Sequence, residues 1–194
     1  MGRPACPRPR SSLTWFRLKW VTSLAAPSGI SVPMTVVRFR RRLPHWQQER
    51  ATYFVTWRLA RRQAALTAAE RTLILEAMRY FDHRRYHLHA AVVMDDHAHA
   101  IVTPMEGWSL SAILHNWKSY TAHRIRKAGD RGVPIWQDES YDRIVRSERE
   151  LSAYMRYIWE NPIKRWPGQA KYQWLWFVGE AYPCILKMRH FPCK

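Results

Sequence analysis

The sequence is poor in acidic residues, cysteine and glycine. Only 15 residues are Asp or Glu, against 32 that are Lys or Arg, so the formal net charge is +17. The three cysteines (Cys6, Cys184 and Cys193) show no Cys-x-x-Cys spacing. That pattern argues against a zinc ribbon or a disulfide framework and favours a reducing, cytoplasmic setting. Having only 7 glycines excludes a collagen-like chain. No apolar run approaches the ~18–20 residues that span a bilayer, so we expect no membrane segment.

What the chain has instead is apolar and aromatic surface. Hydrophobic residues make up 47% of the 194 residues, aromatic residues make up 13%, and 11 residues are Trp. A chain with this much aromatic surface is not disordered throughout and can fill the core of one domain. We therefore expect one domain of ordinary size with a tail, not two domains.

The positive charge is concentrated near the N-terminus. No acidic residue precedes Glu49, whereas nine basic residues do: Arg3, Arg8, Arg10, Arg17, Lys19, Arg38, Arg40, Arg41 and Arg42. Prolines and serines interrupt any periodicity in residues 1–44, so we expect a basic, disordered tail. Either it is a nucleic-acid-binding arm, or translation starts downstream, for example at Met34. An excess of positive charge favours a nucleic acid as the partner, through neutralisation of phosphates and release of counterions.

Beyond the tail, the pattern predicts strands and helices in a defined order. Apolar residues alternate over 52–59, as in a strand, and Thr67 with Glu70 forms a capping box that opens a helix. Ser147 with Glu150 predicts a second capping box, whose helix Pro162 is expected to end. The predicted elements are a strand over 52–59, a helix over 67–80, strands over 86–94 and 97–103, a helix over 109–127 capped by Gly129, a strand between 135 and 145, and a final helix from 147.

This order predicts an α+β fold. Its first six elements form the βαββαβ pattern of a ferredoxin-like antiparallel sheet, to which the last helix is added. We expect the folded domain to span 45–166. Residues 167–194 are expected to be an irregular, aromatic extension that wraps the core.

Two histidine pairs have the spacing of a metal site on a strand. His97 and His99 are at positions i and i+2, so both side chains point to one face. The same is true of His87 and His89 on the preceding strand, and periodicity does not choose between the pairs. Asp95 and Asp96 flank the first pair as further candidate ligands.

The last predicted helix carries a second set of candidates. Tyr157 and Asn161 are four residues apart and therefore neighbours on one flank of that helix. Tyr154 lies closer to the buried stripe. A tyrosine hydroxyl has a pKa of ~10 and needs a metal or a base to act as a nucleophile.

Basic residues are also interspersed with aromatic ones around the predicted sheet, a combination suited to single-stranded nucleic acid. The candidates for nucleic-acid binding are Arg38, Arg40, Arg41, Arg42, Lys118, Arg124, Arg143 and Arg146.

Three blocks of sequence together resemble a known family. Residues 92–102, Val-Val-Met-Asp-Asp-His-Ala-His-Ala-Ile-Val, resemble the metal-binding strand of the single-domain HUH tyrosine transposases. Residues 135–137 and 141–146 resemble a block that these proteins carry downstream, and residues 154–162 resemble their nucleophile helix. The REP-associated tyrosine transposases are the most similar subgroup. The resemblance covers about 44–166, with its three blocks in the family's order.

The resemblance implies an activity and assigns roles. It implies a metal-dependent single-strand DNA endonuclease and strand transferase that acts on hairpin-bearing DNA through a 5′-phosphotyrosine intermediate. It assigns the metal, Mg²⁺ or Mn²⁺, to His97 and His99, with Asn161 as a third ligand, and the nucleophile to Tyr157. Asp95-Asp96 departs from the family, which commonly has Pro-Asn or Pro-Glu there. The alternatives are a non-cleaving DNA-binding protein derived from such a transposase, and a basic, RNA-binding structural protein in which the histidines are incidental. Relatives include both monomers and homodimers.

Overall fold

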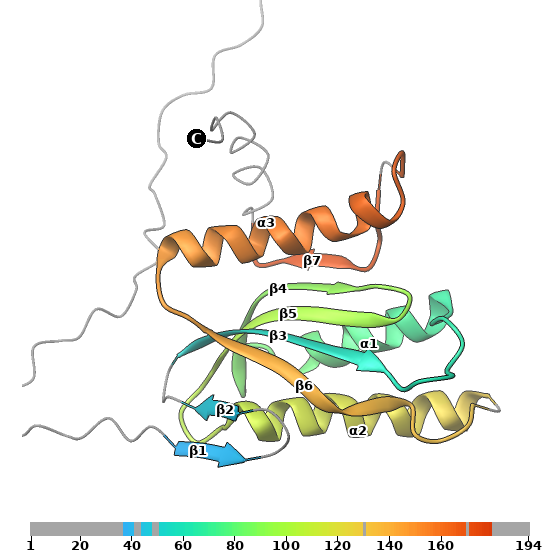
Figure 1. Cartoon of the computed structure of the whole chain (residues 1–194), viewed down its shortest axis with the longest axis horizontal. Coiled ribbons are helices and arrows are strands. Elements are labelled where there is room, and N and C mark those ends of the chain that lie inside the picture. The colour runs from blue at the N-terminus through green and yellow to red at the C-terminus, as the bar shows by residue number, and fades with distance from the viewer. Residues whose placement is uncertain (1–36, 41–43, 48–50, 130, 170, 180–194) are drawn as a thin grey trace, which may run out of the picture. The chain divides into compact units, whose positions relative to one another are not determined.

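The computed structural model describes residues 37–40, 44–47, 51–129, 131–169 and 171–179. Five strands form an antiparallel sheet in the order β6-β3-β5-β4-β7. These are β3 (Thr52–Leu59), β4 (Tyr86–Val93), β5 (His97–Pro104), β6 (Trp136–Val145) and β7 (Leu175–Phe177). Strands β3, β4, β5 and β6 are arranged in the sheet as β6-β3-β5-β4, which is the ferredoxin-like order. The expected fold class is therefore confirmed (Figure 1).

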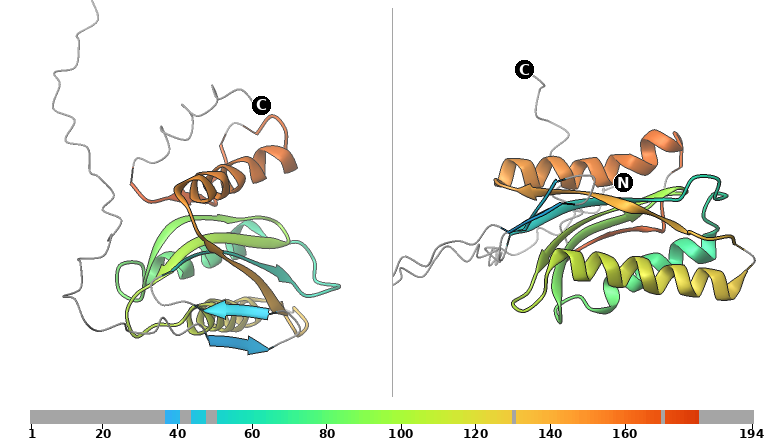
Figure 2. Two further views of the ribbon diagram at one scale, coloured as in Figure 1. Left: turned by 60° about the vertical axis from the view of Figure 1, so that its left-hand side comes forward. Right: turned by 60° about the horizontal axis from the view of Figure 1, so that its bottom comes forward.

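The two faces of the sheet are covered by different helices. Helices α1 (Ala68–Tyr80) and α2 (Leu110–Ala128) pack on one face, and α3 (Glu148–Arg165) lies over the other (Figure 2). The larger core lies under α1 and α2, where Trp57 and Trp117 are almost fully buried. A smaller core lies under α3 and includes Phe54, Ile101 and Ile158. No helix in the described part of the chain is long and apolar enough to cross a membrane.

The predicted start of α1 is confirmed in detail. The side chain of Thr67 accepts a hydrogen bond from the Glu70 amide, and the Glu70 carboxylate accepts one from the Thr67 amide. Helix α2 begins after its N-cap, Ser109, and ends at Ala128, with Gly129 as the expected C-cap.

Helix α3 differs from the prediction at both ends. It does not stop at Pro162 but continues to Arg165, and the amide of Trp166 donates to the carbonyl of Pro162. Pro162 is buried, so packing offsets the backbone hydrogen bond that proline cannot make. At the start, Ser147 caps Glu150 as predicted, but the Glu150 carboxylate accepts from the Arg146 amide, so the capping box is incomplete.

Structure also occurs outside the expected catalytic core. Strand β7 lies in the extension that we expected to be irregular, and it pairs with β4 at the edge of the sheet. An open strand edge has unpaired backbone groups that this pairing satisfies. Strand β1 (Val37–Arg40) lies within the predicted tail and pairs with β2 (Pro44–Gln47), which begins at the last residue of that tail. The remainder of that tail, residues 1–36 and 41–43, lies outside the described residues, as do residues 180–194.

Candidate functional site

Strand β5 presents His97 and His99 to the face of the sheet that α3 covers. The hairpin that aims them is tight, because the Met94 amide donates to the carbonyl of His97 across the Asp95-Asp96 turn. The two imidazole ring centroids are 4.7 Å apart, with the ring planes 76° to each other. The structure therefore brings the predicted pair together at the start of a central strand.

His97 is held by a carboxylate. Its Nδ1 bonds to Oδ1 of Asp96, and the other oxygen of Asp96 lies 3.7 Å from the Arg58 guanidinium on β3. Burial alone would raise the pKa of the Asp96 carboxyl, but the bond from His97 and the nearby positive charges lower it overall. Asp96 is thus an ionised acceptor for the Nδ1–H of His97. This bond fixes the tautomer and leaves Nε2 to bind elsewhere.

His99 is held by a hydroxyl. Its Nδ1 shares a hydrogen bond of 2.7 Å with Oγ1 of Thr56, which lies directly opposite it on β3. His99 is 4% exposed, and burial, aided by the proximity of His97, lowers its pKa to about 3. The ring is therefore neutral at physiological pH, which is the form that ligates metals. Its Nε2 is buried without a hydrogen-bond partner.

Phe54 connects the histidines to α3. Its ring stacks on Tyr154, with centroids 4.4 Å apart, and on His99, with centroids 5.4 Å apart. The ring of Tyr157 lies edge-on to the rings of Phe54 and His99, at centroid distances of 5.7 Å and 5.1 Å. Tyr157 is 42% exposed, whereas Tyr154 is half-buried and burial raises its pKa. Of the two tyrosines, Tyr157 is therefore the one that combines access to solvent with contact to His99.

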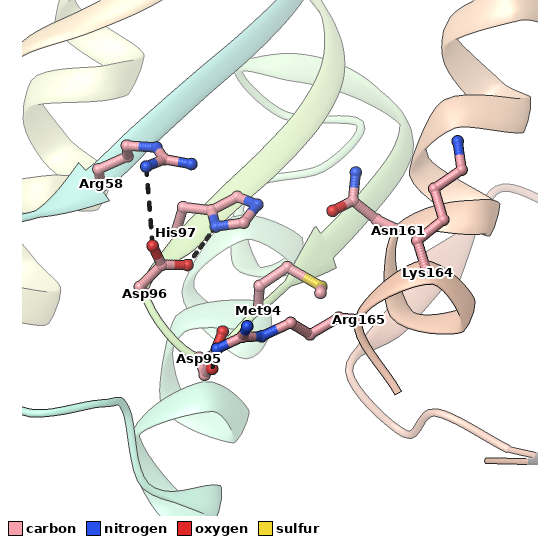
Figure 3. A pocket seen from close by; sticks show the side chains of 8 residues that line it. All are labelled: Arg58, Met94, Asp95, Asp96, His97, Asn161, Lys164 and Arg165. Atoms are coloured by element: carbon pink, nitrogen blue, oxygen red, sulfur yellow. Dashed lines mark hydrogen bonds and ion pairs between the residues drawn. The ribbon is translucent and has the colours of Figure 1, made fainter. Parts of the chain in front are cut away.

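Asn161 lies one turn after Tyr157 and lines a hollow of ≈ 370 Å³ together with His97 (Figure 3). Its amide nitrogen donates to the Tyr157 carbonyl at 3.4 Å, so the carbonyl oxygen of its side chain is left for the hollow. Cations also line the hollow. Arg165 pairs with Asp95 at 2.9 Å, and Lys164 pairs with Glu160 at 2.9 Å. The hollow is thus bordered by His97 on the sheet, by Asn161 on α3 and by cations from both the sheet and α3.

The alternative pair, His87 and His89, does not converge on one point. The pairing of β4 with β5 shifts register between Leu88 and Ala90, so His89 lies at a bulge. Nε2 of His89 bonds to Thr103 at 2.8 Å, and burial lowers the pKa of His89 to about 4. His87 is exposed and lies beside His83 instead.

The candidate DNA-binding residues occupy different surroundings. Arg143 is exposed on the face under α3 and lies 3.4 Å from Glu150, and Arg146 is exposed at the end of β6. Arg124 is exposed on α2, on the other side of the sheet. The Lys118 ammonium donates to the carbonyls of Gln137 and Asp138, so it joins α2 to β6. Arg38 and Arg40 belong to β1, whose side chains are outside the description, as are Arg41 and Arg42.

The donor set fits a divalent metal. Nε2 of the neutral His99 ring is a buried polar atom without a hydrogen-bond partner. Burying such an atom costs ~1–3 kcal/mol of folding free energy unless a ligand binds it. His97, whose ring centroid lies 4.7 Å from that of His99, provides a second nitrogen, and Asn161, which lines the same hollow as His97, provides an oxygen. Two nitrogens and one oxygen suit Mn²⁺ and other transition ions better than Mg²⁺, which prefers oxygen ligands.

The sequence pattern did not identify Thr56, Phe54 or Arg58 as members of the site. The alternation over 52–59 predicts that all three side chains lie on one face of the strand, and this is all that the sequence pattern indicates about them. That this face lies opposite His97 and His99 depends on the register of β3 with β5, which alternation does not determine.

Comparisons with known proteins give a match to one family profile and to solved structures. The profile of the family described as "Transposase IS200 like" matches residues 47–161, more than half of the chain. A solved REP-associated tyrosine transposase bound to a REP hairpin is similar in fold, with 22% identity and a TM-score of 0.54. The match covers 73% of this chain and 91% of that one. A Deinococcus radiodurans protein thought to be a transposase matches with 19% identity and a TM-score of 0.42, over 56% of this chain and 88% of that one. No curated protein matches.

Proposed function

The chain belongs to the IS200-like transposase family, and on that premise we propose that it is a metal-dependent endonuclease and strand transferase for single-stranded DNA. One observation carries the proposal. The exposed Tyr157 lies edge-on to His99, whose Nε2 is buried and unpaired. A nucleophile and a metal donor are thus adjacent, and all the residues involved come from one chain. This supports a site that is complete in a monomer and is equally compatible with a homodimer.

The proposed site divides the work between the sheet and α3. His97, His99 and Asn161 would hold a divalent cation, Mn²⁺ or Mg²⁺. When bound, the cation supplies Lewis-acid stabilisation of charge on the oxygens of the scissile phosphate. Asp96 and Thr56 hold the two imidazoles through their Nδ1 atoms, which leaves both Nε2 atoms as the candidate metal ligands. Lys164 and Arg165 border the hollow and offset phosphate charge.

Tyr157 supplies the nucleophile. Its Oη forms a bond to phosphorus as the bond from phosphorus to the 3′ oxygen breaks. The phenolic proton passes to solvent, and the 3′ oxygen takes up a proton as it leaves. The products are a 5′-phosphotyrosine and a free 3′-OH. The reverse attack by another 3′-OH rejoins the strand without a nucleotide cofactor, because the energy of the broken bond is kept in the phosphotyrosine.

DNA binding is proposed for the basic residues on the α3 side of the sheet and for the N-terminal tail. Arg143 and Arg146 are exposed next to the start of α3, and exposed Tyr141 lies across from Thr56 on the same face. Charges for phosphates next to a ring for stacking suit a single strand. The resemblance to hairpin-binding transposases makes a DNA hairpin with a short single-stranded flank the proposed substrate.

The test is cleavage of an end-labelled hairpin oligonucleotide by the full chain with Mn²⁺. The proposal predicts a covalent protein–DNA adduct that survives denaturation. The adduct should not form when the protein is treated with EDTA before it is mixed with the DNA. Tight hairpin binding without any adduct would contradict cleavage and favour a non-cleaving DNA-binding protein.

A further inference from the structure

A second group of metal-binding side chains lies far from the candidate active site. Asp82, His83 and His87 surround the turn between α1 and β4, and each offers one ligand atom within 4.8 Å of the others. His87 pairs in register with Thr103, which is six residues along β5 from His97. At ~3.3 Å per residue, this turn is ~20 Å from His97. No residue of this group takes part in the proposed cleavage reaction.

The backbone of the turn fixes the carboxylate. Oδ1 of Asp82 accepts hydrogen bonds from the amides of His83 at 3.0 Å and Leu88 at 2.8 Å. That oxygen is therefore engaged, while Oδ2 faces the His83 ring, with 3.6 Å between Oδ2 and Nε2. The amide of His83 donates to the Tyr86 carbonyl at 2.8 Å, which closes the turn. The second carboxylate oxygen is thus held in place before any ion arrives.

The two imidazoles lie next to that oxygen. His83 has a φ of 59°, in the left-handed region that non-glycine residues rarely adopt. This conformation brings its ring to His87, with centroids 5.4 Å apart and the planes 70° to each other. Both histidines are exposed, so their side chains can rotate. Around a tetrahedral ion with bonds of ~2.0–2.1 Å, ligand atoms lie ~3.3 Å apart, which needs only small side-chain rotations from the present arrangement.

We propose that Asp82, His83 and His87 form a binding site for a transition-metal ion of the Zn²⁺ class. Two imidazole nitrogens and one carboxylate oxygen match the ligand preference of Zn²⁺, with water completing the coordination. Mg²⁺ and Ca²⁺, which prefer oxygen ligands, are excluded by the same argument. A bound ion joins the end of α1 to the start of β4 and stabilises the folded state by mass action, because the unfolded chain lacks the assembled site.

The test uses the full chain, freed of metal, in a background that lacks the two histidines of the candidate active site (His97→Ala with His99→Gln). Zn²⁺ binding and Zn²⁺-induced change in melting temperature are measured in this background and in two derivatives. One adds His87→Ala and the other adds His115→Ala, an exposed histidine on α2 that serves as the matched control. Asp82 is left intact because its carboxylate also supports the turn. Zinc that binds elsewhere, including at the cysteines, is common to both derivatives.

The proposal predicts that His87→Ala weakens the tightest Zn²⁺ binding at least tenfold and removes the zinc-induced stabilisation, whereas His115→Ala changes neither. His83→Ala should reproduce His87→Ala. Equal zinc binding in the His87→Ala and His115→Ala derivatives would overturn the proposal and mark an adventitious ion only. If the double background fails to fold, the same comparison is made with His87→Ala and His115→Ala in the otherwise unchanged chain. Adduct formation with Mn²⁺ does not depend on this site, so either proposal can fail alone.

Discussion

Thr56→Val removes one hydroxyl group and tests whether the support of His99 matters. In the native chain, Oγ1 of Thr56 lies 2.7 Å from Nδ1 of His99, which is 4% exposed. Valine has nearly the same shape but cannot form that bond. Nδ1 of a buried ring then has no partner, which costs about 1–3 kcal/mol of folding free energy. For a chain of this size, each kcal/mol corresponds to about 2–4 °C in melting temperature.

The same substitution should weaken metal binding. Loss of a hydrogen bond that orients a metal-ligating histidine typically costs about 10- to 100-fold in metal affinity, or about 1.4–2.8 kcal/mol. The assay is calorimetric titration of Mn²⁺ into metal-free protein, together with thermal unfolding.

Thr52→Val is the matched control. Thr52 lies on the same face of β3, and its hydroxyl bonds to Thr103 at 2.7 Å, about 13 Å along the strand from Thr56. It should lose some stability but keep its Mn²⁺ affinity. If Thr56→Val binds Mn²⁺ within twofold of Thr52→Val, the argument that Thr56 orients His99 for a metal is refuted.

Three further predictions concern other parts of the chain. Asp96→Asn keeps an acceptor for His97 but removes its charge, so Mn²⁺ affinity measured by calorimetry should fall about tenfold, and unchanged affinity would count against a role for that charge. Burial lowers the pKa of His99 to about 3, so the unfolded state takes up a proton below pH ~6.5 that the folded state does not. The share of the free energy of unfolding that depends on a neutral His99 is therefore fully present above pH ~6.5. As the pH is lowered from 6.5 to 4, the free energy of unfolding should fall by up to ~1.4 kcal/mol per pH unit. Urea unfolding in EDTA should show a shallower fall for His99→Gln, and an equal slope would contradict the assignment. Removing residues 1–36 should leave cleavage at saturating DNA intact but flatten the salt dependence of log affinity by ~0.7 for each phosphate that these residues neutralise, and an unchanged slope would exclude binding of phosphates by residues 1–36.

Local sequence patterns predicted most of the fold because they act within one element. The alternation over 52–59 predicted β3 with its bounds, and Thr67 with Glu70 predicted the start of α1. Pro162 was misjudged because burial of its ring, a tertiary effect, allows α3 to continue. Strand β7 has only three residues and no pattern of its own, since it exists by pairing with the edge of β4.

The residues of the candidate site were predicted only where a local sequence pattern or the family resemblance singled them out. The spacing of His97 and His99, and the resemblance that singled out Tyr157, named residues that the structure brings together. Thr56 and Phe54 were missed because their contact with His99 depends on how two strands pair across 43 and 45 residues of sequence. Such register information is not contained in the periodicity of either strand.

The central claim is that Tyr157 is the nucleophile, and Tyr157→Phe tests it most directly. The change removes one oxygen from a side chain that is 42% exposed, so the fold should survive. Tyr154→Phe is the matched control, because Tyr154 stacks on Phe54 one helical turn earlier. With a labelled hairpin and Mn²⁺, the account predicts that Tyr157→Phe binds the hairpin but forms no covalent adduct at any Mn²⁺ concentration, whereas Tyr154→Phe still forms it. An adduct in Tyr157→Phe that disappears in Tyr154→Phe would contradict the account and move the nucleophile to Tyr154.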